Sequence, residues 1–405
     1  MLTFKINYSY LALVFLIIVS GFDVVSVNAA GANIRLSYFV FAIFFLKLYL
    51  FSKATMSIRE LLFVLLLFAC ALFTLIYAEN LKIGVAYSIW LLVNFFCVFL
   101  VFRALTIKLG VHFAIRAYQL AFRLQIIIAA FLFVAGVQER AHFLYYEPSY
   151  FVLASIPYLT IAVYMRVVMK HAGLLDLFLI MLMLLITKSA FLMLLILIIY
   201  TTVMLTKEGV SRSSIARLAV FTLAISIFSY LYVTFSNDLI ARTIRDLIES
   251  PSVLIAALER SGNRWPRIQM VWDAIIVNFP YGIGPGNYER YSINFNQGVD
   301  YSNGLPWLEP RGKPAVNMWF EIIVELGIVA AILFLSKYFG WWLKARAFPV
   351  KHPIKIFSVI LIVYFIAFMF ESNYLRVYFW GILGVIAGCL KVSEFKPSLL
   401  GSKYE

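Results

Sequence analysis

The sequence is organised around a long polar insert, whose centre reads Pro280-Tyr281-Gly282-Ile283-Gly284-Pro285-Gly286-Asn287. The insert runs from about residue 236 to residue 315 and separates two strongly apolar parts of the chain. Nearly all its basic side chains are arginines: Arg242, Arg245, Arg260, Arg264, Arg267, Arg290, Arg311 and Lys313. Aromatic residues surround the glycine-rich centre: Tyr288, Tyr291, Tyr301 and Trp307.

Arginine suits phosphate and pyrophosphate, because the guanidinium donates two parallel, charge-assisted hydrogen bonds. Aromatic faces and amide side chains suit sugars, whose apolar C–H patches are rimmed by hydroxyl groups. A polar insert that carries both beside a membrane indicates a lipid-linked, phosphate-bearing glycan as substrate. The alternative is a solvated loop whose arginines pair with the acidic residues of the insert itself.

The composition excludes a soluble globular domain. Hydrophobic residues make up 63% of the 405 residues, charged residues only 13%, and the mean hydropathy is +0.93, whereas soluble domains carry roughly a quarter charged residues. The net charge of +14 is spread over short loops between apolar runs, so anionic lipid is a better partner than nucleic acid. The three cysteines lie in apolar runs, and no His/Asp cluster suits a metal ion.

The apolar runs predict an all-α polytopic membrane protein with about twelve transmembrane helices, since each run can cross roughly 30 Å of hydrocarbon. The runs are 8–28, 34–52, 60–78, 83–102, 117–137, 150–169, 173–187, 189–206, 214–235, 316–337, 355–371 and 375–391. We therefore expect a nine-helix region at 1–235, a large periplasmic loop with short amphipathic helices at 236–315, and three helices with a cytoplasmic tail at 316–405. Basic residues concentrate on the face that carries both termini, which predicts cytoplasmic termini and an extracytoplasmic loop.

Several ionisable residues lie within the apolar runs, where a charge is expensive and therefore a candidate for function. Arg123 must meet an anion, a carbonyl group or a water-filled cavity, and we leave open whether it faces a lipid phosphate or an internal partner. Asp23, Glu321, Glu325 and Glu371 are expected near the outer surface, where pairing with Arg35, Arg376 or a loop arginine is favoured. Lys188 is a lone outer cation, either a lipid-phosphate contact or an interfacial anchor.

Glu147 precedes Pro148 at the entry of the sixth run, so it is expected beside a helix N-terminus. Its carboxylate can cap that helix, or it can accept a proton from a sugar hydroxyl.

Within the insert, residues 238–249, 252–260 and 264–279 are predicted helices. Arg264 and Arg267 share a face at the start of the third helix, where unpaired backbone N–H groups also favour an anion. Gly282, Gly284 and Gly286 follow a helix rather than a strand, which excludes a dinucleotide-binding loop. They predict a tight turn that brings the backbone close to substrate.

These motifs together resemble the superfamily of O-antigen polymerases and O-antigen ligases, the Wzy-type polymerases especially. The residues that carry the resemblance lie between about 140 and 335: Glu147-Pro148-Ser149, Thr187-Lys188-Ser189, Asn263-Arg264, Arg267, Trp272, Gly282 to Asn287, Asn317 and Glu325-Leu326-Gly327. Two positions depart from the family pattern. Val316 stands where ligases usually carry histidine, and Ala190 stands where an arginine is often found.

The resemblance implies a metal-independent glycosyltransferase of the GT-C kind in the bacterial inner membrane, with its active site facing the periplasm and no cofactor. Its substrates are expected to be undecaprenyl-pyrophosphate-linked glycans, and its other partners membrane lipid, a chain-length regulator and a flippase. Arg264, Arg267 and Glu147 are the expected catalytic residues. The expected substrate-binding residues are Arg123, Lys188, Arg242, Arg245, Arg290, Gly282, Gly284, Gly286, Asn287, Tyr288 and Asn317.

The favoured reaction is polymerisation, in which a growing chain moves from its pyrophosphate carrier to the incoming lipid-linked repeat unit. The rival within enzymes is a ligase, which moves the finished glycan to lipid A core. The rivals outside enzymes are a lipid-linked-oligosaccharide flippase and a chain-length or assembly partner. Neither of these needs a large outer loop with clustered arginines, so the insert favours an enzyme.

Overall fold

The computed structural model describes residues 8–395 except 30, 31, 52, 53, 172, 210–215, 217–219, 221–262, 303 and 373. Nearly all of the expected span 214–235 and the expected helices 238–249 and 252–260 lie outside the described residues. So do two of the expected substrate-binding residues, Arg242 and Arg245.

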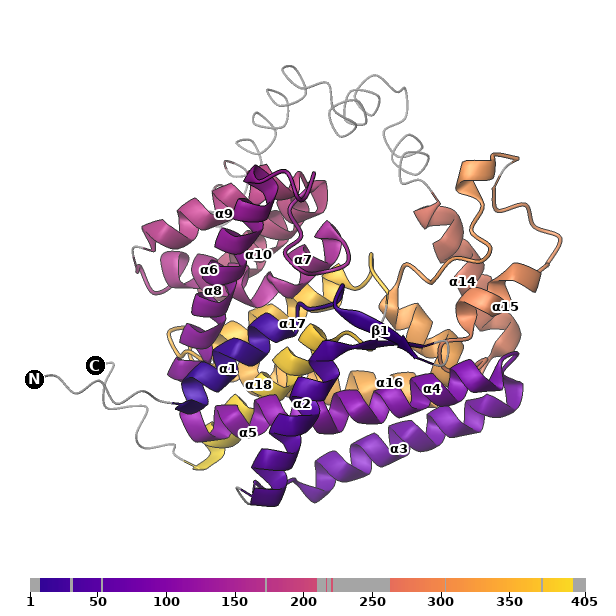
Figure 1. The fold of residues 1–405 in the computed structure, drawn as a ribbon, viewed down its shortest axis with the longest axis horizontal. Coiled ribbons are helices and arrows are strands. Elements are labelled where there is room, and N and C mark those ends of the chain that lie inside the picture. The colour runs from indigo at the N-terminus through magenta and orange to yellow at the C-terminus, as the bar shows by residue number, and fades with distance from the viewer. Residues whose placement is uncertain are drawn as a thin grey trace, which may run out of the picture.

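The described chain consists mainly of helices (Figure 1). In order, the elements are α1 (Tyr8–Val19), β1 (Ser26–Ala29), β2 (Ala32–Arg35), α2 (Leu36–Leu46), η1 (Lys47–Phe51), α3 (Ile58–Thr74), η2 (Leu75–Tyr77), α4 (Leu81–Val93), η3 (Asn94–Phe99), α5 (Leu100–Leu109), α6 (Val111–Val134), α7 (Pro148–Ala154), α8 (Ile156–Val167), α9 (Leu174–Thr187), α10 (Ala190–Glu208), α14 (Arg264–Asn278), α15 (Tyr288–Asn294), η4 (Pro306–Leu308), α16 (Met318–Arg346), α17 (Lys355–Ala367) and α18 (Val377–Phe395).

Five of the described helices are long and apolar enough to cross a membrane: 58–77, 81–109, 111–134, 318–346 and 377–394. The pair α7 and α8 makes a sixth if it counts as one span, and five further apolar helices are shorter. The chain is therefore a polytopic membrane protein. Apart from 214–235, each expected span contains a helix or consecutive helices.

The span expected at 150–169 is bent by 48° where α7 meets α8. Pro157 lies in the first turn of α8, where a proline lacks the N–H that a continuous helix would use. The bend separates the short α7, which begins directly after Glu147, from the longer α8.

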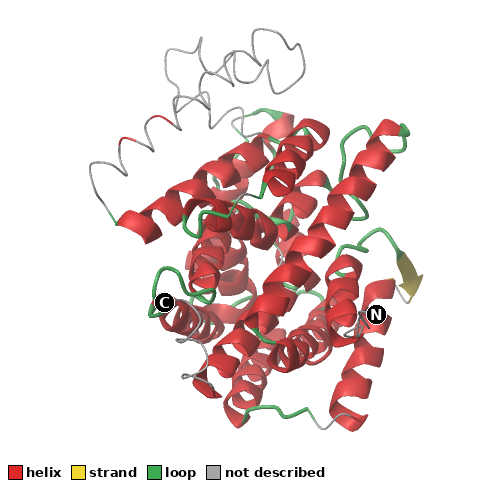
Figure 2. Ribbon diagram, turned by 90° about the vertical axis from the view of Figure 1, so that its left-hand side faces the viewer, coloured by secondary structure: helices red, strands yellow, loops and turns green. Residues whose placement is uncertain are grey.

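One antiparallel hairpin, formed by β1 and β2, is the exception to the all-helical expectation. It lies at one edge of the molecule (Figure 2). Because α1 ends at Val19, the first apolar run is a shorter helix than the expected 8–28. The hairpin ends at Arg35, which pairs with Asp23 at 2.9 Å.

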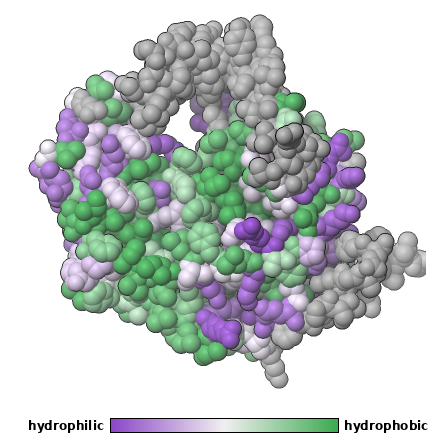
Figure 3. Space-filling model, turned by 180° about the vertical axis from the view of Figure 1, so that it is seen from behind, coloured by the Kyte–Doolittle hydropathy of each residue, from purple (hydrophilic) through white to green (hydrophobic). Residues whose placement is uncertain are grey.

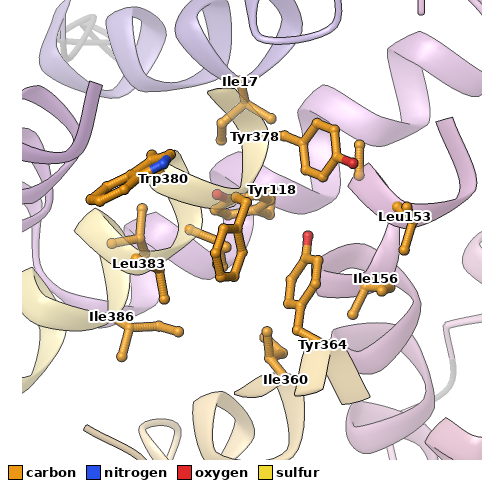
Figure 4. Close-up of a cluster of buried hydrophobic side chains, with 14 of the residues drawn as sticks. Ile17, Tyr118, Leu153, Ile156, Ile360, Tyr364, Tyr378, Trp380, Leu383 and Ile386 are labelled. Carbon is orange, nitrogen blue, oxygen red and sulfur yellow. The ribbon is translucent and has the colours of Figure 1, made fainter. Parts of the chain in front are cut away.

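The core forms where α18 packs against α5 and η3. Gly384 permits this contact, because a Cβ there would lie 2.3 Å from the Phe99 carbonyl oxygen. Close helix packing through small residues is typical of membrane proteins. Figure 4 shows Tyr118, Tyr364 and Tyr378 of three different helices turned into one buried cluster.

The outer surface is largely apolar, as expected for a lipid-facing protein. On the face in Figure 3, hydrophobic side chains occupy much of the centre and hydrophilic ones gather toward the sides. Among the exposed apolar residues are Ile43, Leu65, Phe131, Phe178 and Val329, which belong to five different helices. Such a surface is stable in hydrocarbon and unfavourable in water.

Candidate functional site

The glycine-rich turn packs against a break in α16. Gly327 leaves helical geometry with φ of 80°, so carbonyl groups of the preceding turn lose their helical partners. The turn supplies new ones: the Ile283 amide donates to Val324 O at 2.8 Å, and the Gly284 amide donates to Glu325 O at 3.0 Å. In return the Ile328 amide donates to Pro280 O at 3.1 Å. A broken membrane helix is tolerated where protein satisfies the freed backbone groups.

Glycine is required on both sides of this contact. A Cβ on Gly282 would lie 2.6 Å from the Gly327 amide nitrogen, and a Cβ on Gly327 would lie 2.6 Å from Tyr281 O. Both residues also have positive φ, 85° and 80°, a region that other residues rarely adopt. The turn and the broken helix are therefore in direct backbone contact, whereas the expected approach of this backbone to substrate stays a prediction.

Glu325 binds the C-terminal end of the glycine-rich turn. Its carboxylate accepts hydrogen bonds from the Gly286 amide at 2.7 Å, the Tyr288 amide at 3.3 Å and the Tyr374 hydroxyl at 3.1 Å. The residue is only 3% exposed, and a buried carboxylate is stable only when it is hydrogen-bonded. The expectation that Glu325 pairs with an arginine is wrong, because backbone amides and a tyrosine take that place.

A cavity of about 180 Å³ opens beside this junction. Seven parts of the chain meet there: α4, α7, the glycine-rich turn, α15, α16 and the two segments that precede α16 and α18. The lining residues are Tyr87, Tyr150, Gly286, Tyr288, Glu289, Pro314, Ala315, Glu321, Glu325, Ser372 and Arg376. Aromatic rings and carboxylates thus dominate a small chamber, with one guanidinium among them.

Arg376 is the cation of this cavity, and it is 6% exposed. Its guanidinium carbon lies 3.6 Å from the centroid of the Tyr150 ring. Its nearest carboxylate, Asp23 at 3.8 Å, also pairs with Arg35 at 2.9 Å. Arg376 has a buried Nε–H without a hydrogen-bond partner among the described residues.

Arg264 and Arg267 lie on the first turns of α14 and bond to residues in or beside the cavity wall, a position that we call its rim. Arg264 donates to Phe370 O at 2.7 Å and pairs with Glu371 at 3.3 Å. Arg267 donates through its Nε to the carbonyl oxygen of the cavity residue Pro314 at 2.8 Å. Burial lowers the pKa of Arg267, and the nearby charge of Arg264 lowers this pKa further.

Arg267 is joined to the cavity wall by its hydrogen bond to the carbonyl oxygen of Pro314. Internal contacts occupy only part of each guanidinium, which carries five N–H donors. The pairing of Glu371 with a loop arginine is confirmed, as is the pairing of Asp23 with Arg35.

Glu147 is exposed at the N-cap position of α7, without a capping hydrogen bond from its side chain. Its carboxylate accepts from the Ser149 hydroxyl at 3.1 Å and interacts electrostatically with Glu371. Tyr150, one turn further along α7, lines the cavity. Glu147 therefore lies one helical turn from a lining residue of the cavity and within electrostatic range of Glu371, the partner of Arg264.

Arg123 is not part of this site. It lies on α6, which lends no residue to the cavity, and it forms a bidentate pair with Asp176 of α9 at 2.8 Å for each contact. The Tyr158 hydroxyl donates to the same carboxylate at 3.0 Å. Of the lipid phosphate and the internal partner that the sequence left open for Arg123, the structure provides the internal partner, Asp176.

Lys188 ends α9 in a left-handed conformation and is exposed. Its ammonium group lies 5.6 Å from the centroid of the Phe133 ring, and its carbonyl oxygen accepts from Arg140 at 3.3 Å. Lys188 does not line the cavity, and neither does the exposed Arg290.

Two predicted asparagines hold backbone in place. Asn287 is fully buried, accepts from the Asn80 amide at 2.9 Å and donates to Pro285 O at 3.1 Å. Asn317 caps α16 by accepting from the amides of Trp319 and Phe320 at 2.9 and 3.1 Å. Both shape the walls of the cavity without lining it.

The sequence analysis missed Arg376, Tyr87 and Tyr150 as site residues. An arginine at the edge of an apolar run was a usable signal for Arg376, and the four-residue spacing of Glu321 and Glu325 placed both on one helix face. Nothing in the sequence indicated that α4 and α7 reach the same cavity.

In the described residues, no three His, Cys, Asp or Glu side chains gather closely enough to hold a metal ion.

A family model described as O-antigen ligase matches residues 173–335. The matched part includes α9, α10, α14, α15, the glycine-rich turn and the break in α16, but neither Glu147 nor Arg376. No curated protein matches the chain.

Proposed function

We propose, on the premise that this chain belongs to the O-antigen polymerase and ligase superfamily, that it polymerises lipid-linked oligosaccharide repeat units into O-antigen or a related surface polysaccharide. The family indicates a glycosyltransferase-like activity on lipid-linked glycans in a membrane. One observation carries the finer proposal: a chamber of tyrosines and carboxylates, built on a broken membrane helix, has two arginines at its rim.

The chamber suits a sugar ring better than a phosphate. The rings of Tyr87, Tyr150 and Tyr288 offer faces for C–H patches. The carboxylates of Glu289, Glu321 and Glu325 accept hydrogen bonds from hydroxyl groups but repel a phosphate. The pyrophosphate is therefore assigned to the rim, where Arg264 and Arg267 provide positive charge.

The reaction follows from these two positions, with the sugar in the chamber and the pyrophosphate at the rim. The acceptor hydroxyl attacks the anomeric carbon of the donor chain, and the bond from that carbon to the pyrophosphate oxygen breaks with inversion. Arg264 and Arg267 stabilise the negative charge that develops on the leaving pyrophosphate, as preorganised cations do in a water-poor site. The acceptor proton passes to Glu147, the proposed base. Arg376, which lines the chamber, donates a guanidinium N–H to an oxygen of the bound sugar.

The proposal also covers the topology, the lipid carrier and the partners of the protein. The protein is a GT-C-type enzyme with about twelve spans in the bacterial inner membrane, divided at 1–235, 236–315 and 316–405. Both termini are cytoplasmic, and the chamber faces the periplasm. Undecaprenyl pyrophosphate carries both donor and acceptor, and no metal ion takes part. Membrane lipid, a flippase and a chain-length regulator are the proposed partners, and nucleic acid is not a partner.

A ligase is the second candidate, because the matching family model carries that description. A ligase must activate a hydroxyl of lipid A core, and the resembling enzymes use a histidine where this chain has Val316. Val316 is buried at 3% exposure, and its isopropyl group neither accepts a proton nor forms a hydrogen bond. This position favours the polymerase.

A lipopolysaccharide gel of a null strain separates the two reactions. We expect lipid A core capped with a single repeat unit, no long ladder, and restoration of the ladder by a plasmid copy. Uncapped core with long polymer retained on undecaprenyl pyrophosphate would instead identify a ligase. An unchanged ladder would overturn both assignments.

A further inference from the structure

A second cavity, of about 420 Å³, lies between α10, α16 and α17. Its lining combines two cations, an indole, three hydroxyl groups and three aliphatic side chains: Thr202, Leu205, Thr206, Trp342, Arg346, Lys355, Ser358, Val359 and Ile362. It shares no residue with the candidate site.

The two cavities lie at opposite ends of α16. The first includes Glu321 and Glu325 near the start of this 29-residue helix, and the second includes Arg346, its last residue. The helix is broken at Gly327, and its 19 residues beyond the break, 328–346, extend about 28 Å, close to the roughly 30 Å of the hydrocarbon layer. The second cavity therefore lies at the opposite membrane surface.

The cations of this cavity have no carboxylate beside them among its lining residues. The Arg346 guanidinium lies over the Trp342 ring, 5.0 Å from its centroid, an arrangement that leaves the guanidinium edge free to donate hydrogen bonds. The Lys355 ammonium donates to Arg346 O, which occupies one of its three N–H groups. Two neighbouring cations of this kind favour an anion between them.

The other walls are suited to a lipid. Thr202, Thr206 and Ser358 each donate to a carbonyl oxygen of their own helix, so they line the cavity without requiring water. Leu205, Val359 and Ile362 add an aliphatic wall. An indole with two cations at a membrane surface is the pattern that contacts lipid headgroups.

We propose that this cavity binds an anionic phospholipid of the leaflet opposite the candidate site. Arg346 and Lys355 hold the phosphate, and Leu205, Val359 and Ile362 contact the first part of an acyl chain. The proposal is independent of the reaction at the candidate site, since it rests on a different set of residues.

The test uses purified full-length protein in a neutral detergent. Native mass spectrometry and thermal unfolding are measured with added phosphatidylglycerol, phosphatidylcholine or inorganic phosphate. We expect phosphatidylglycerol alone to bind and to raise the unfolding temperature. Arg346→Gln and Lys355→Gln should each weaken its binding by about fivefold. Leu205→Trp, which fills the cavity mouth at an exposed position, should weaken binding without changing the charge.

Lys351→Gln is the matched control, because Lys351 is exposed between α16 and α17 but does not line the cavity. An equal loss of binding in this control would show diffuse attraction to surface charge and would overturn the proposal. Equal binding of phosphatidylcholine would do the same. An equal response to inorganic phosphate would assign the cavity to a free anion rather than a lipid.

Discussion

Glu325 accepts a hydrogen bond from the Gly286 amide at 2.7 Å, and so it joins the broken helix α16 to the start of α15. The same carboxylate accepts from the Tyr288 amide and the Tyr374 hydroxyl. One side chain therefore fixes three walls of the candidate site: the glycine-rich turn, α15 and the segment before α18. Its position explains why a carboxylate is stable at this depth.

Removing this carboxylate should loosen the site. Glu325→Ala leaves buried donors without an acceptor, each of which costs about 1–3 kcal/mol, so we expect a lower unfolding temperature together with reduced polymer formation. Glu325→Gln keeps one acceptor oxygen and should lie between the alanine variant and the wild type. Circular dichroism melting and a polymer gel provide the two readouts. Glu139→Gln, at an exposed position outside the cavity, serves as the matched control; a Glu325→Ala protein that melts and polymerises like this control would contradict the positioning role.

Arg264→Ala and Arg267→Ala should each reduce the rate of polymerisation by about two to three decades, because each removes one contact to the developing charge. Lysine keeps the charge but loses the forked geometry, so Arg264→Lys and Arg267→Lys should recover activity only in part. Rates are measured with purified protein and lipid-linked repeat units, after immunoblots show equal amounts in the membrane. Lys313→Ala removes an exposed cation of the same loop and should stay near wild type. Normal rates in both alanine variants would show that these arginines have only a structural role.

Gly327→Ala tests the backbone contact between turn and helix. The new Cβ would lie 2.6 Å from Tyr281 O, at a residue with φ of 80°. We expect a marked fall in unfolding temperature, since neither backbone can move without breaking the hydrogen bonds of the turn. Gly340→Ala in the same helix has open space around its Cβ and should be neutral or stabilising by about 0.5–1 kcal/mol. Equal stability of the two variants would show that the break in α16 does not depend on Gly327.

Metal independence is expected because arginines are the proposed counter-charge of the pyrophosphate. Purified enzyme should keep its polymerisation rate in excess EDTA. A loss of activity that Mg²⁺ or Mn²⁺ restores would show that a metal ion carries this charge instead.

The proposed orientation can be checked by labelling cysteines in a background without Cys70, Cys97 and Cys389. Val299→Cys, exposed in the loop after α15, should react with an impermeant maleimide on cells with a permeabilised outer membrane. Lys351→Cys, exposed between α16 and α17, should react only after lysis. The reverse pattern would place the candidate site in the cytoplasm.

The sequence by itself determined that the chain is a helical membrane protein with a polar, arginine-rich insert. Long apolar runs leave the backbone no other way to satisfy its hydrogen bonds in lipid, and each of them that the structure describes contains helix. The sequence also placed Arg264 and Arg267 on one face of a helix and Gly282 in a turn, because helical spacing and glycine conformation are local properties.

Only the tertiary structure decided which of these residues meet. Arg123 and Asp176 are 53 residues apart in sequence, and their pairing removes Arg123 from the site. Tyr87, Tyr150 and Arg376 lie far apart in the sequence and line one cavity, which no local pattern indicates. Glu325 follows the same rule. Its spacing gave its helix face, but the amides that donate to it belong to Gly286 and Tyr288, 39 and 37 residues earlier. Helix periodicity sets the direction of a side chain, whereas its partner is set by how the helices pack.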